Sequence, residues 1–310
     1  MPYTLSHPAF AIPLRRLGLP TTALAIGSLT PDLPVWAQMV GVGRPLRNAG
    51  WSYSATHSVT GILTLCLATG IVLWAWWLFI RRPLYDALPA SWRNSNPDID
   101  PWRRTRHRRG RGGNRSRIFT AGLSILGLWI GAASHVLVDE FTHEGRWAHT
   151  AIAWYDTLIA GVSVAQWAQY AGSVFGLVVV FLAIRSWLLE RKGEDSELDS
   201  GAKEWVSTTA KALRNRRRLL MRTALIGGAL VGMGKAVSVM LTAPFSYVVA
   251  YAGTVGVVWA AAGATLGAIM WHVVSQANRA NLARPRDEGS RDTALQELAH
   301  ATPPTPGASK

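Results

Sequence analysis

The sequence predicts an all-α, polytopic integral membrane protein, with about five transmembrane helices and short N-terminal interfacial or re-entrant helices. Three observations support this fold class. The mean hydropathy is +0.14, only 16% of the 310 residues are charged, and tryptophan occurs 15 times. Soluble domains carry about a quarter charged residues, so this composition is typical of a membrane protein with polar loops.

Five stretches are each long and apolar enough to cross a bilayer, which takes about 20 helical residues. None shows the alternating pattern of a strand, so we expect each to be a helix. Gln166 and Gln169 in the third stretch and Lys235 in the fourth make these two less apolar than the others. The five stretches lie at 58–80, 118–138, 162–184, 224–244 and 247–274.

The region before the first span is expected to form short helices on, or dipping into, the outer membrane interface. The segment 6–18 fits a short amphipathic helix. The apolar stretch 22–40 is interrupted by Pro31 and Pro34, which disfavour a continuous helix. The alternative is a sixth span, which would place His7 on the inner side.

The distribution of Arg and Lys predicts the orientation of the spans. The connection 81–117 has eleven Arg against three Asp, and 185–223 has ten Arg or Lys against six acids. Both should be cytoplasmic, as should the C-terminus. The connection 139–161, with four acids and Arg146 as its one Arg or Lys, should face outward.

This pattern divides the sequence into four regions. The sequence has a single cysteine, Cys66, which excludes an internal disulfide. The tail is expected to be disordered, because it is basic and carries three Pro in its last ten residues. The regions are a membrane domain with the candidate site at 1–185, a basic cytoplasmic linker at 186–223, a two-helix membrane segment at 224–275 and the tail at 276–310.

A polar cluster follows the second apolar stretch. His135, Asp139 and His143 are spaced i, i+4, i+8, which places them within about 80° of one helix face. Imidazole and carboxylate groups on adjacent turns can bind one metal ion or neighbouring ions. The alternative is an Asp that orients a His at a helix end. Polar groups at the edge of a span usually face the bundle interior or a watery cavity, which favours a site.

Three more residues are expected on the same outer side. His57 precedes the first span and should lie beside the end of the second, because consecutive helices usually pack together. Asp32 lies in a rigid Pro-containing turn, and Pro8 favours an extended His7. Each has a plain alternative, namely a helix-cap histidine, an ordinary Asx turn and a stray terminal histidine. Together, imidazoles and carboxylates suit zinc, or manganese as a second choice.

The Arg-rich segment 103–117 could bind nucleic acid, since the net charge of the chain is +14. Proteins that bind single-stranded nucleic acid usually place aromatic residues among the basic ones. This segment has few aromatic residues nearby beyond Trp102. The simpler interpretation is a cytoplasmic loop that sets topology and touches anionic membrane lipid. Membrane lipid is therefore the expected partner, and nucleic acid is not.

The segments that contain His7, Asp32, His57 and His135 carry four distinctive motifs. These motifs resemble a bacterial membrane family with no assigned function, domain-of-unknown-function family 4184, which implies a location in the bacterial cytoplasmic membrane. This resemblance covers about residues 1–185. The order of ligand types is also similar, more distantly, to bacterial inner-membrane metal-dependent hydrolases and helical zinc-dependent phospholipase C proteins. The second resemblance implies metal ligands at His7, Asp32, His57, His135 and Asp139, to which the helix spacing adds His143. The motifs are "TLSHPAFAIPLRR", "ALAIGSLTPDLP", "HSVTGIL" and "GAASHVLVDEFTH".

Two functions from different classes remain open at this point. The first is a metal-dependent hydrolase of a phosphoester or acyl bond, in a lipid or envelope precursor, with Glu144 as a proton carrier. Its metal would activate water and polarise the substrate oxygen. The second is a non-enzymatic transporter or assembly factor, with the polar cluster as a structural network or ion-binding gate. A pocket on the outer face would favour hydrolysis, and a continuous polar path across the bilayer would favour transport.

Overall fold

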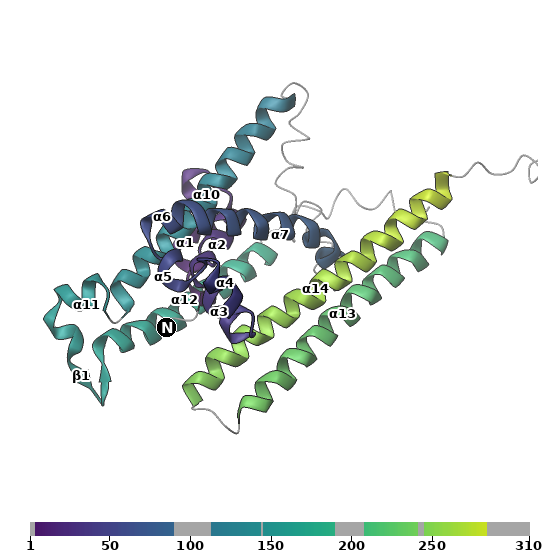
Figure 1. Ribbon diagram of the computed structural model, residues 1–310. Coiled ribbons are helices and arrows are strands. Elements are labelled where there is room, and N and C mark those ends of the chain that lie inside the picture. The colour runs from purple at the N-terminus through teal and green to yellow at the C-terminus, as the bar shows by residue number, and fades with distance from the viewer. Residues whose placement is uncertain (1–3, 90–112, 144, 190–207, 241–244, 284–310) are drawn as a thin grey trace, which may run out of the picture.

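A computed structural model describes residues 4–89, 113–143, 145–189, 208–240 and 245–283, and these form an almost entirely helical protein (Figure 1). Five of its helices are long. The first to third lie with the short N-terminal elements, and the last two run side by side as a hairpin (Figure 1). The long helices are α7 Leu67–Ala87, α10 Gly113–Thr142, α12 Val164–Leu189, α13 Thr208–Met240 and α14 Phe245–Ala283.

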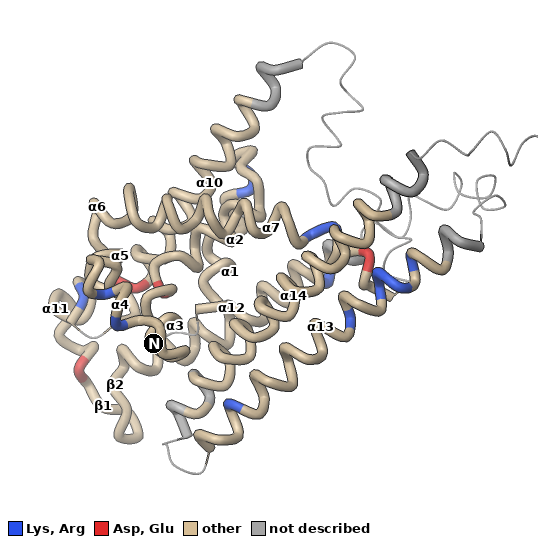
Figure 2. Tube along the Cα trace, turned by 45° about the vertical axis from the view of Figure 1, so that its right-hand side comes forward, with Lys and Arg blue, Asp and Glu red and all other residues tan. Residues whose placement is uncertain are grey.

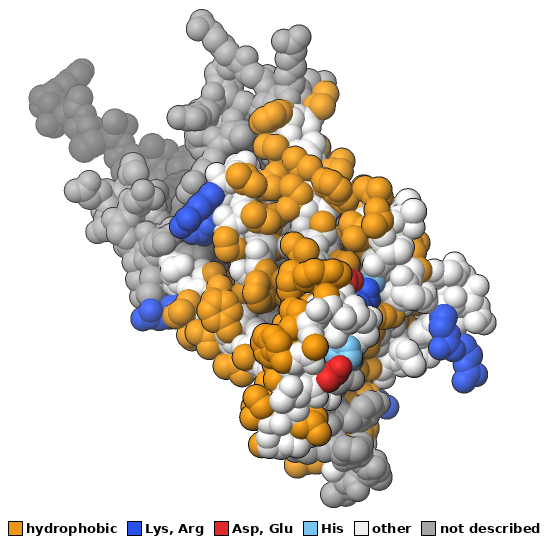
Figure 3. Space-filling model, turned by 90° about the vertical axis from the view of Figure 1, so that its left-hand side faces the viewer, with side chains coloured by type: hydrophobic (Ala, Val, Ile, Leu, Met, Phe, Trp, Pro, Cys, Tyr) orange, Lys and Arg blue, Asp and Glu red, His pale blue; other side chains and the backbone are white. Residues whose placement is uncertain are grey.

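The predicted membrane character is confirmed. Within the described residues, five helical segments are long and apolar enough to span a membrane, and each overlaps one of the predicted spans. The second ends 13 residues later than predicted, and the fourth begins 12 residues earlier. Hydrophobic side chains cover much of the face shown in Figure 3, as expected for helices surrounded by lipid. The segments are Val59–Ala87, Ile118–Ala151, Val164–Ser186, Ala212–Met240 and Tyr251–Ala277.

The first span begins with a short, irregular start. Ser58 caps it, because its hydroxyl accepts a hydrogen bond from the Gly61 amide at 2.9 Å. A three-residue helix, α6 Val59–Gly61, and a π-helical segment, η4 Ile62–Cys66, then lead into α7. This cap fixes where the helix starts, directly after His57.

The helix that carries the polar cluster is longer than predicted. α10 continues to Thr142, although the predicted span ends at 138. Asp139 does not end the helix. Its side chain is buried inside the bundle, where it lies among other polar side chains. His135 and Asp139 therefore both lie on regular helical backbone.

The N-terminal region forms short elements, as predicted, and the alternative of a sixth span finds no support among the described residues. Within the described residues, α2 packs against α10 and α7. The elements are η1 Thr4–Ser6, α1 Pro8–Ala11, η2 Ile12–Leu17, α2 Thr21–Gly27, η3 Thr30–Asp32, α3 Leu33–Met39, α4 Gly43–Asn48 and α5 Tyr53–Thr56.

Two glycines explain why α2 can lie so close to α10. A methyl group at Gly131 would collide with the Leu24 carbonyl oxygen and lie 2.9 Å from the Ser28 nitrogen. A methyl group at Gly27 would likewise collide with the Leu128 carbonyl. Small residues allow backbones in membrane bundles to approach this closely, so the end of α2 meets α10 one turn before His135.

A short hairpin lies between the second and third spans. α11 Trp147–Ala151 and η5 Ala153–Asp156 precede the antiparallel strands β1 Leu158–Ile159 and β2 Val162–Ser163. The predicted start of the third span at 162 is therefore two residues early, because 162 and 163 pair as a strand and α12 begins at Val164.

The C-terminal hairpin is attached to the rest of the bundle through the end of α7. Ile80, Met221 and Ala268 form a buried apolar cluster there. Asp86 accepts a hydrogen bond from Trp271 Nε1 at 2.9 Å and forms an ion pair with Arg218 at 3.3 Å. Lys and Arg residues gather along this end of α13 (Figure 2), the side predicted to be cytoplasmic.

The close contact between α2 and α10 generates a stability prediction. We expect Gly131→Val to lower the free energy of unfolding by about 1–3 kcal/mol or more, because the added side chain overpacks the contact. Thermal melting in detergent would measure this. Gly122→Val is the matched control, since Gly122 lies on the same helix with nothing near its missing Cβ. Equal melting temperatures for both variants would contradict the packing argument.

Candidate metal centre

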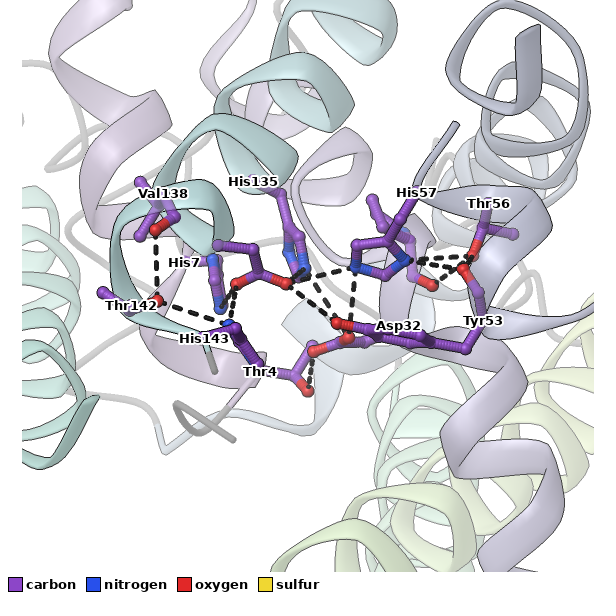
Figure 4. Close-up of polar contacts among 12 residues, drawn as sticks. Thr4, His7, Asp32, Tyr53, Thr56, His57, His135, Val138, Thr142 and His143 are labelled. Atoms are coloured by element: carbon purple, nitrogen blue, oxygen red, sulfur yellow. Dashed lines mark hydrogen bonds and ion pairs between the residues drawn. The ribbon is translucent and has the colours of Figure 1, made fainter. Parts of the chain in front are cut away.

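The structure brings all six residues proposed as metal ligands into one cluster, in which five are buried and His143 is partly buried. Figure 4 labels all of them except Asp139. They come from four separate parts of the chain. Their roles as ligands stay a prediction, and Glu144, the predicted proton carrier, lies outside the described residues. The six are His7 between η1 and α1, Asp32 at the end of η3, His57 after α5, and His135, Asp139 and His143 on or just beyond the end of α10.

Asp139 is the centre of this cluster. Its Oδ2 lies 3.1 Å from His57 Nε2 and 3.4 Å from His135 Nε2. Its Oδ1 lies 3.2 Å from His143 Nδ1 and 3.7 Å from His7 Nε2. The predicted alignment of His135, Asp139 and His143 on one helix face is confirmed, and the two carboxylate oxygens face different pairs of imidazoles.

Asp32 approaches the same place from the opposite side. Its Oδ1 lies 3.6 Å from His135 Nε2 and 3.8 Å from His57 Nε2. One donor atom from each of these three residues and one from Asp139 all lie within 4.8 Å of one another. The turn containing Pro31 places Asp32 here, because η3 ends the apolar run at this point.

Backbone carbonyls orient two of the imidazoles. His135 Nδ1 lies 2.7 Å from the Ser28 carbonyl oxygen, and His57 Nδ1 lies 2.9 Å from the Tyr53 carbonyl oxygen. A carbonyl only accepts, so each Nδ1 is the donor and carries the hydrogen. When such a ring is neutral, its lone pair is therefore on Nε2, the atom that faces the carboxylates. Metal-binding histidines are commonly held in this way.

The nitrogen–oxygen distances in the cluster are of the size that a bound divalent cation requires. Zinc–nitrogen and zinc–oxygen bonds of about 2.0–2.1 Å at tetrahedral angles put neighbouring donor atoms about 3.3 Å apart. The nitrogen–oxygen separations between these imidazoles and carboxylates run from 3.1 to 3.8 Å. Among the described side chains, His135 Nε2 and the Oδ1 atoms of Asp32 and Asp139 are buried without a hydrogen bond. These atoms are the ones that a cation would satisfy.

A second group of donors lies on the other side of Asp139. His7 is buried, its ring stacks on that of His135 at 3.7 Å, and neither of its nitrogens has a hydrogen-bond partner within the described structure. Burial and the neighbouring His135 lower the pKa of His7 to about 3, so its ring is neutral at neutral pH. His7 and His143 thus offer two more nitrogens beside Asp139 Oδ1.

Asp32 is held by a contact that the sequence analysis missed. Thr4 Oγ1 donates a hydrogen bond to Asp32 Oδ2 at 2.7 Å and accepts one from Trp36 Nε1 at 3.1 Å. Burial alone would raise the pKa of Asp32, but His135 and the Thr4 hydroxyl outweigh it and lower the pKa to about 2. Asp32 is therefore an anion at neutral pH.

Tyr53 is a second neighbour that the sequence analysis missed. Its hydroxyl lies 3.5 Å from Asp139 Oδ2, and its ring centroid lies 3.8 Å from that of His57. Burial and the nearby Asp139 raise the pKa of Tyr53 to about 12, so the hydroxyl keeps its proton. The one available signal was its position four residues before His57, one helical turn away.

Comparison with known families agrees with the sequence motifs. The sequence matches the family described as domain of unknown function DUF4184 over residues 1–276. The match extends beyond 1–185, where the motifs lie, and includes most of the C-terminal hairpin. No curated protein and no solved structure matches the chain. The similarity to metal-dependent hydrolases stays a prediction. The match covers most of the sequence, and the chain belongs to the DUF4184 family.

Proposed function

We propose that this protein is a membrane-bound hydrolase that uses divalent metal to cleave a phosphoester or acyl bond. One observation carries the proposal. The Nε2 atoms of His57 and His135 face two buried carboxylates, and the ion pairs of both carboxylates within the described structure are with histidines, not with Lys or Arg. Buried carboxylates need a compensating charge, and a divalent cation supplies it.

The donor groups divide into two sets that share Asp139. Asp32, His57 and His135 with Asp139 Oδ2 would hold one ion. His7 and His143 with Asp139 Oδ1 would hold a second. Nitrogen and carboxylate donors suit zinc, with manganese as the alternative. Such an ion lowers the pKa of water and polarises a phosphoryl or acyl oxygen.

The remaining residues have roles that do not depend on which bond is cleaved. The Ser28 and Tyr53 carbonyls keep the Nε2 lone pairs of the two imidazoles directed inward. The Thr4 hydroxyl fixes the Asp32 carboxylate. The protonated Tyr53 hydroxyl lies at the edge of the cluster, where it donates a hydrogen bond to Asp139 Oδ2 at 3.5 Å.

A cavity beside the cluster supports hydrolysis over transport. It has a volume of about 710 Å³, and Tyr53 forms part of its wall. Ligand cavities are commonly about 300–1,000 Å³. A pocket next to the cluster is the feature that hydrolysis requires, whereas the transporter alternative requires a polar path through the bilayer. Whether the cavity faces outward rests on the predicted topology.

Metal content is the primary test of the proposal. We expect the purified protein to hold one or two zinc or manganese ions per chain, and the His135→Ala, Asp139→Ala variant to hold none, as measured by elemental mass spectrometry. The matched control is His149→Ala, Asp156→Ala, which removes another His–Asp pair, at 2.8 Å, with a largely exposed Asp. If a folded parent protein holds no metal after loading, the cluster is a proton-bridged structural network and the proposal fails.

The hydrogen bond from Thr4 gives a second prediction. We expect Thr4→Val to weaken metal binding by about 10–100-fold, because groups that orient metal ligands contribute on this scale. Competition with a fluorescent chelator would measure the affinity. Thr60→Val is the control, since Thr60 is exposed and makes no contact with the cluster. Equal affinities in the two variants would remove Thr4 from the site.

Hydrolysis itself is tested with the metal-loaded protein in detergent. We expect turnover of a p-nitrophenyl phosphoester or carboxyl ester that is lost with a chelator and restored by zinc or manganese. Asp139→Asn should lower the rate at least about 100-fold, equivalent to about 2.7 kcal/mol of barrier. The control is the His149, Asp156 double variant. Full metal loading without hydrolysis of any ester class, together with metal flux in proteoliposomes, would instead support the non-enzymatic alternative.

A further inference from the structure

The cavity beside the metal centre is built from segments that adjoin two of the candidate ligands. Val35 and Gln38 line it from α3, which begins directly after Asp32. Tyr53, one helical turn before His57, forms another part of the wall and contacts the cluster. The third side of the cavity is formed by α4. None of the six candidate ligands lines the cavity, and Tyr53 is the residue that belongs to its wall and also contacts the cluster.

Two arginines give the cavity a strong positive charge. Arg44 and Arg47 both line it, and they are three residues apart on α4, so they share a helix face. None of the residues that line the cavity is acidic. Across the part of the chain that the structure describes, neither guanidinium forms an ion pair with a carboxylate. Both are exposed and free to bind an anion.

The positions of these arginines are unexpected from topology alone. The predicted orientation places α4 on the outer side of the membrane, where the positive-inside rule disfavours Arg. Guanidinium groups bind phosphoryl oxygens in a bidentate manner. A phosphoryl ligand in the cavity would therefore explain why Arg44 and Arg47 occur on a side of the membrane where the positive-inside rule disfavours arginine.

Neighbouring apolar residues favour a lipid over free phosphate. Val42 and Leu46 flank the two arginines and are 51% and 37% exposed. Trp51 lines the same cavity, and Trp is enriched where one side of a ring is apolar and the other wet. A surface that combines arginines with exposed apolar side chains and an indole matches a lipid headgroup together with the start of its acyl chains.

We propose that this cavity binds the phosphoryl group of an anionic lipid, with Arg44 and Arg47 as the recognition residues. The lipid as a substrate rests on the proposed hydrolase function, whereas its binding does not require metal. Tyr53 then lies between the bound phosphoryl group and Asp139, and the lipid headgroup is held next to the metal centre.

The test measures binding to the chelator-treated, full-length protein in non-ionic detergent by titration calorimetry. The probes are dihexanoyl phosphatidic acid, dihexanoyl phosphatidylcholine and inorganic phosphate. We expect phosphatidic acid to bind more tightly than the other two. Arg44→Gln, Arg47→Gln should weaken its binding at least about tenfold, the effect of losing one charged hydrogen bond or more.

The matched control is Arg15→Gln, Arg16→Gln, which removes two exposed arginines that do not line the cavity. Its affinity should stay within twofold of the parent. Equal losses in the two double variants, or no loss in either, would show non-specific charge attraction and overturn the proposal. Phosphate that binds as tightly as phosphatidic acid would overturn the assignment to a lipid.

A further arm separates this inference from the hydrolase proposal. The His135→Ala, Asp139→Ala variant should bind phosphatidic acid as the parent does, because the arginines are unchanged. If the protein holds metal and hydrolyses esters but shows no Arg44- and Arg47-dependent lipid binding, only the recognition proposal fails. If lipid binding follows the arginines in a protein that holds no metal, only the hydrolase proposal fails.

Discussion

The burial of two carboxylates among imidazoles is the constraint on which the rest of this structure depends. Asp32 and Asp139 lie almost fully inside the protein, where an uncompensated charge costs several kcal/mol. His57 and His135 each face both carboxylates through Nε2. Such an arrangement is stable only with a cation or extra protons between the groups.

Local backbone features and long-range packing act on the same few atoms. The turn at Pro31 ends the N-terminal apolar run and places Asp32 inside the bundle. The close approach of Gly27 and Gly131 brings the Ser28 carbonyl to His135 Nδ1. The packing of Gly27 against Gly131 therefore also sets the orientation of the His135 ring. A change in this packing would also change the site.

The cavity next to the cluster extends this arrangement toward a substrate. The cluster offers nitrogen and oxygen donors in its interior, whereas the cavity offers the guanidinium groups of Arg44 and Arg47 at its surface. Tyr53 belongs to both, because it lines the cavity and approaches Asp139. The proposed metal would lie inside and the proposed anion recognition at the surface, and this division would suit a reaction on a charged lipid headgroup.

Much of the fold and of the cluster could be predicted from sequence, because both depend on short-range patterns. Apolar length identified the spans, and helical periodicity placed His135, Asp139 and His143 on one face. Charge in the connections suggested that His57 lies at the same end. These signals are local, since a residue's neighbours on a helix are its neighbours in sequence.

The tertiary structure decided the rest. Several decisive contacts join segments that are far apart in the chain. They are the packing of α2 on α10, the Thr4 hydrogen bond to Asp32, and the Ser28 carbonyl that orients His135. The cavity formed by α3 and α4 likewise depends on the tertiary structure. No pattern in the sequence marks these contacts, because they depend on how closely two backbones approach. That distance is set by packing in three dimensions, where the absence of one methyl group at Gly131 is enough to determine which carbonyl meets the ring.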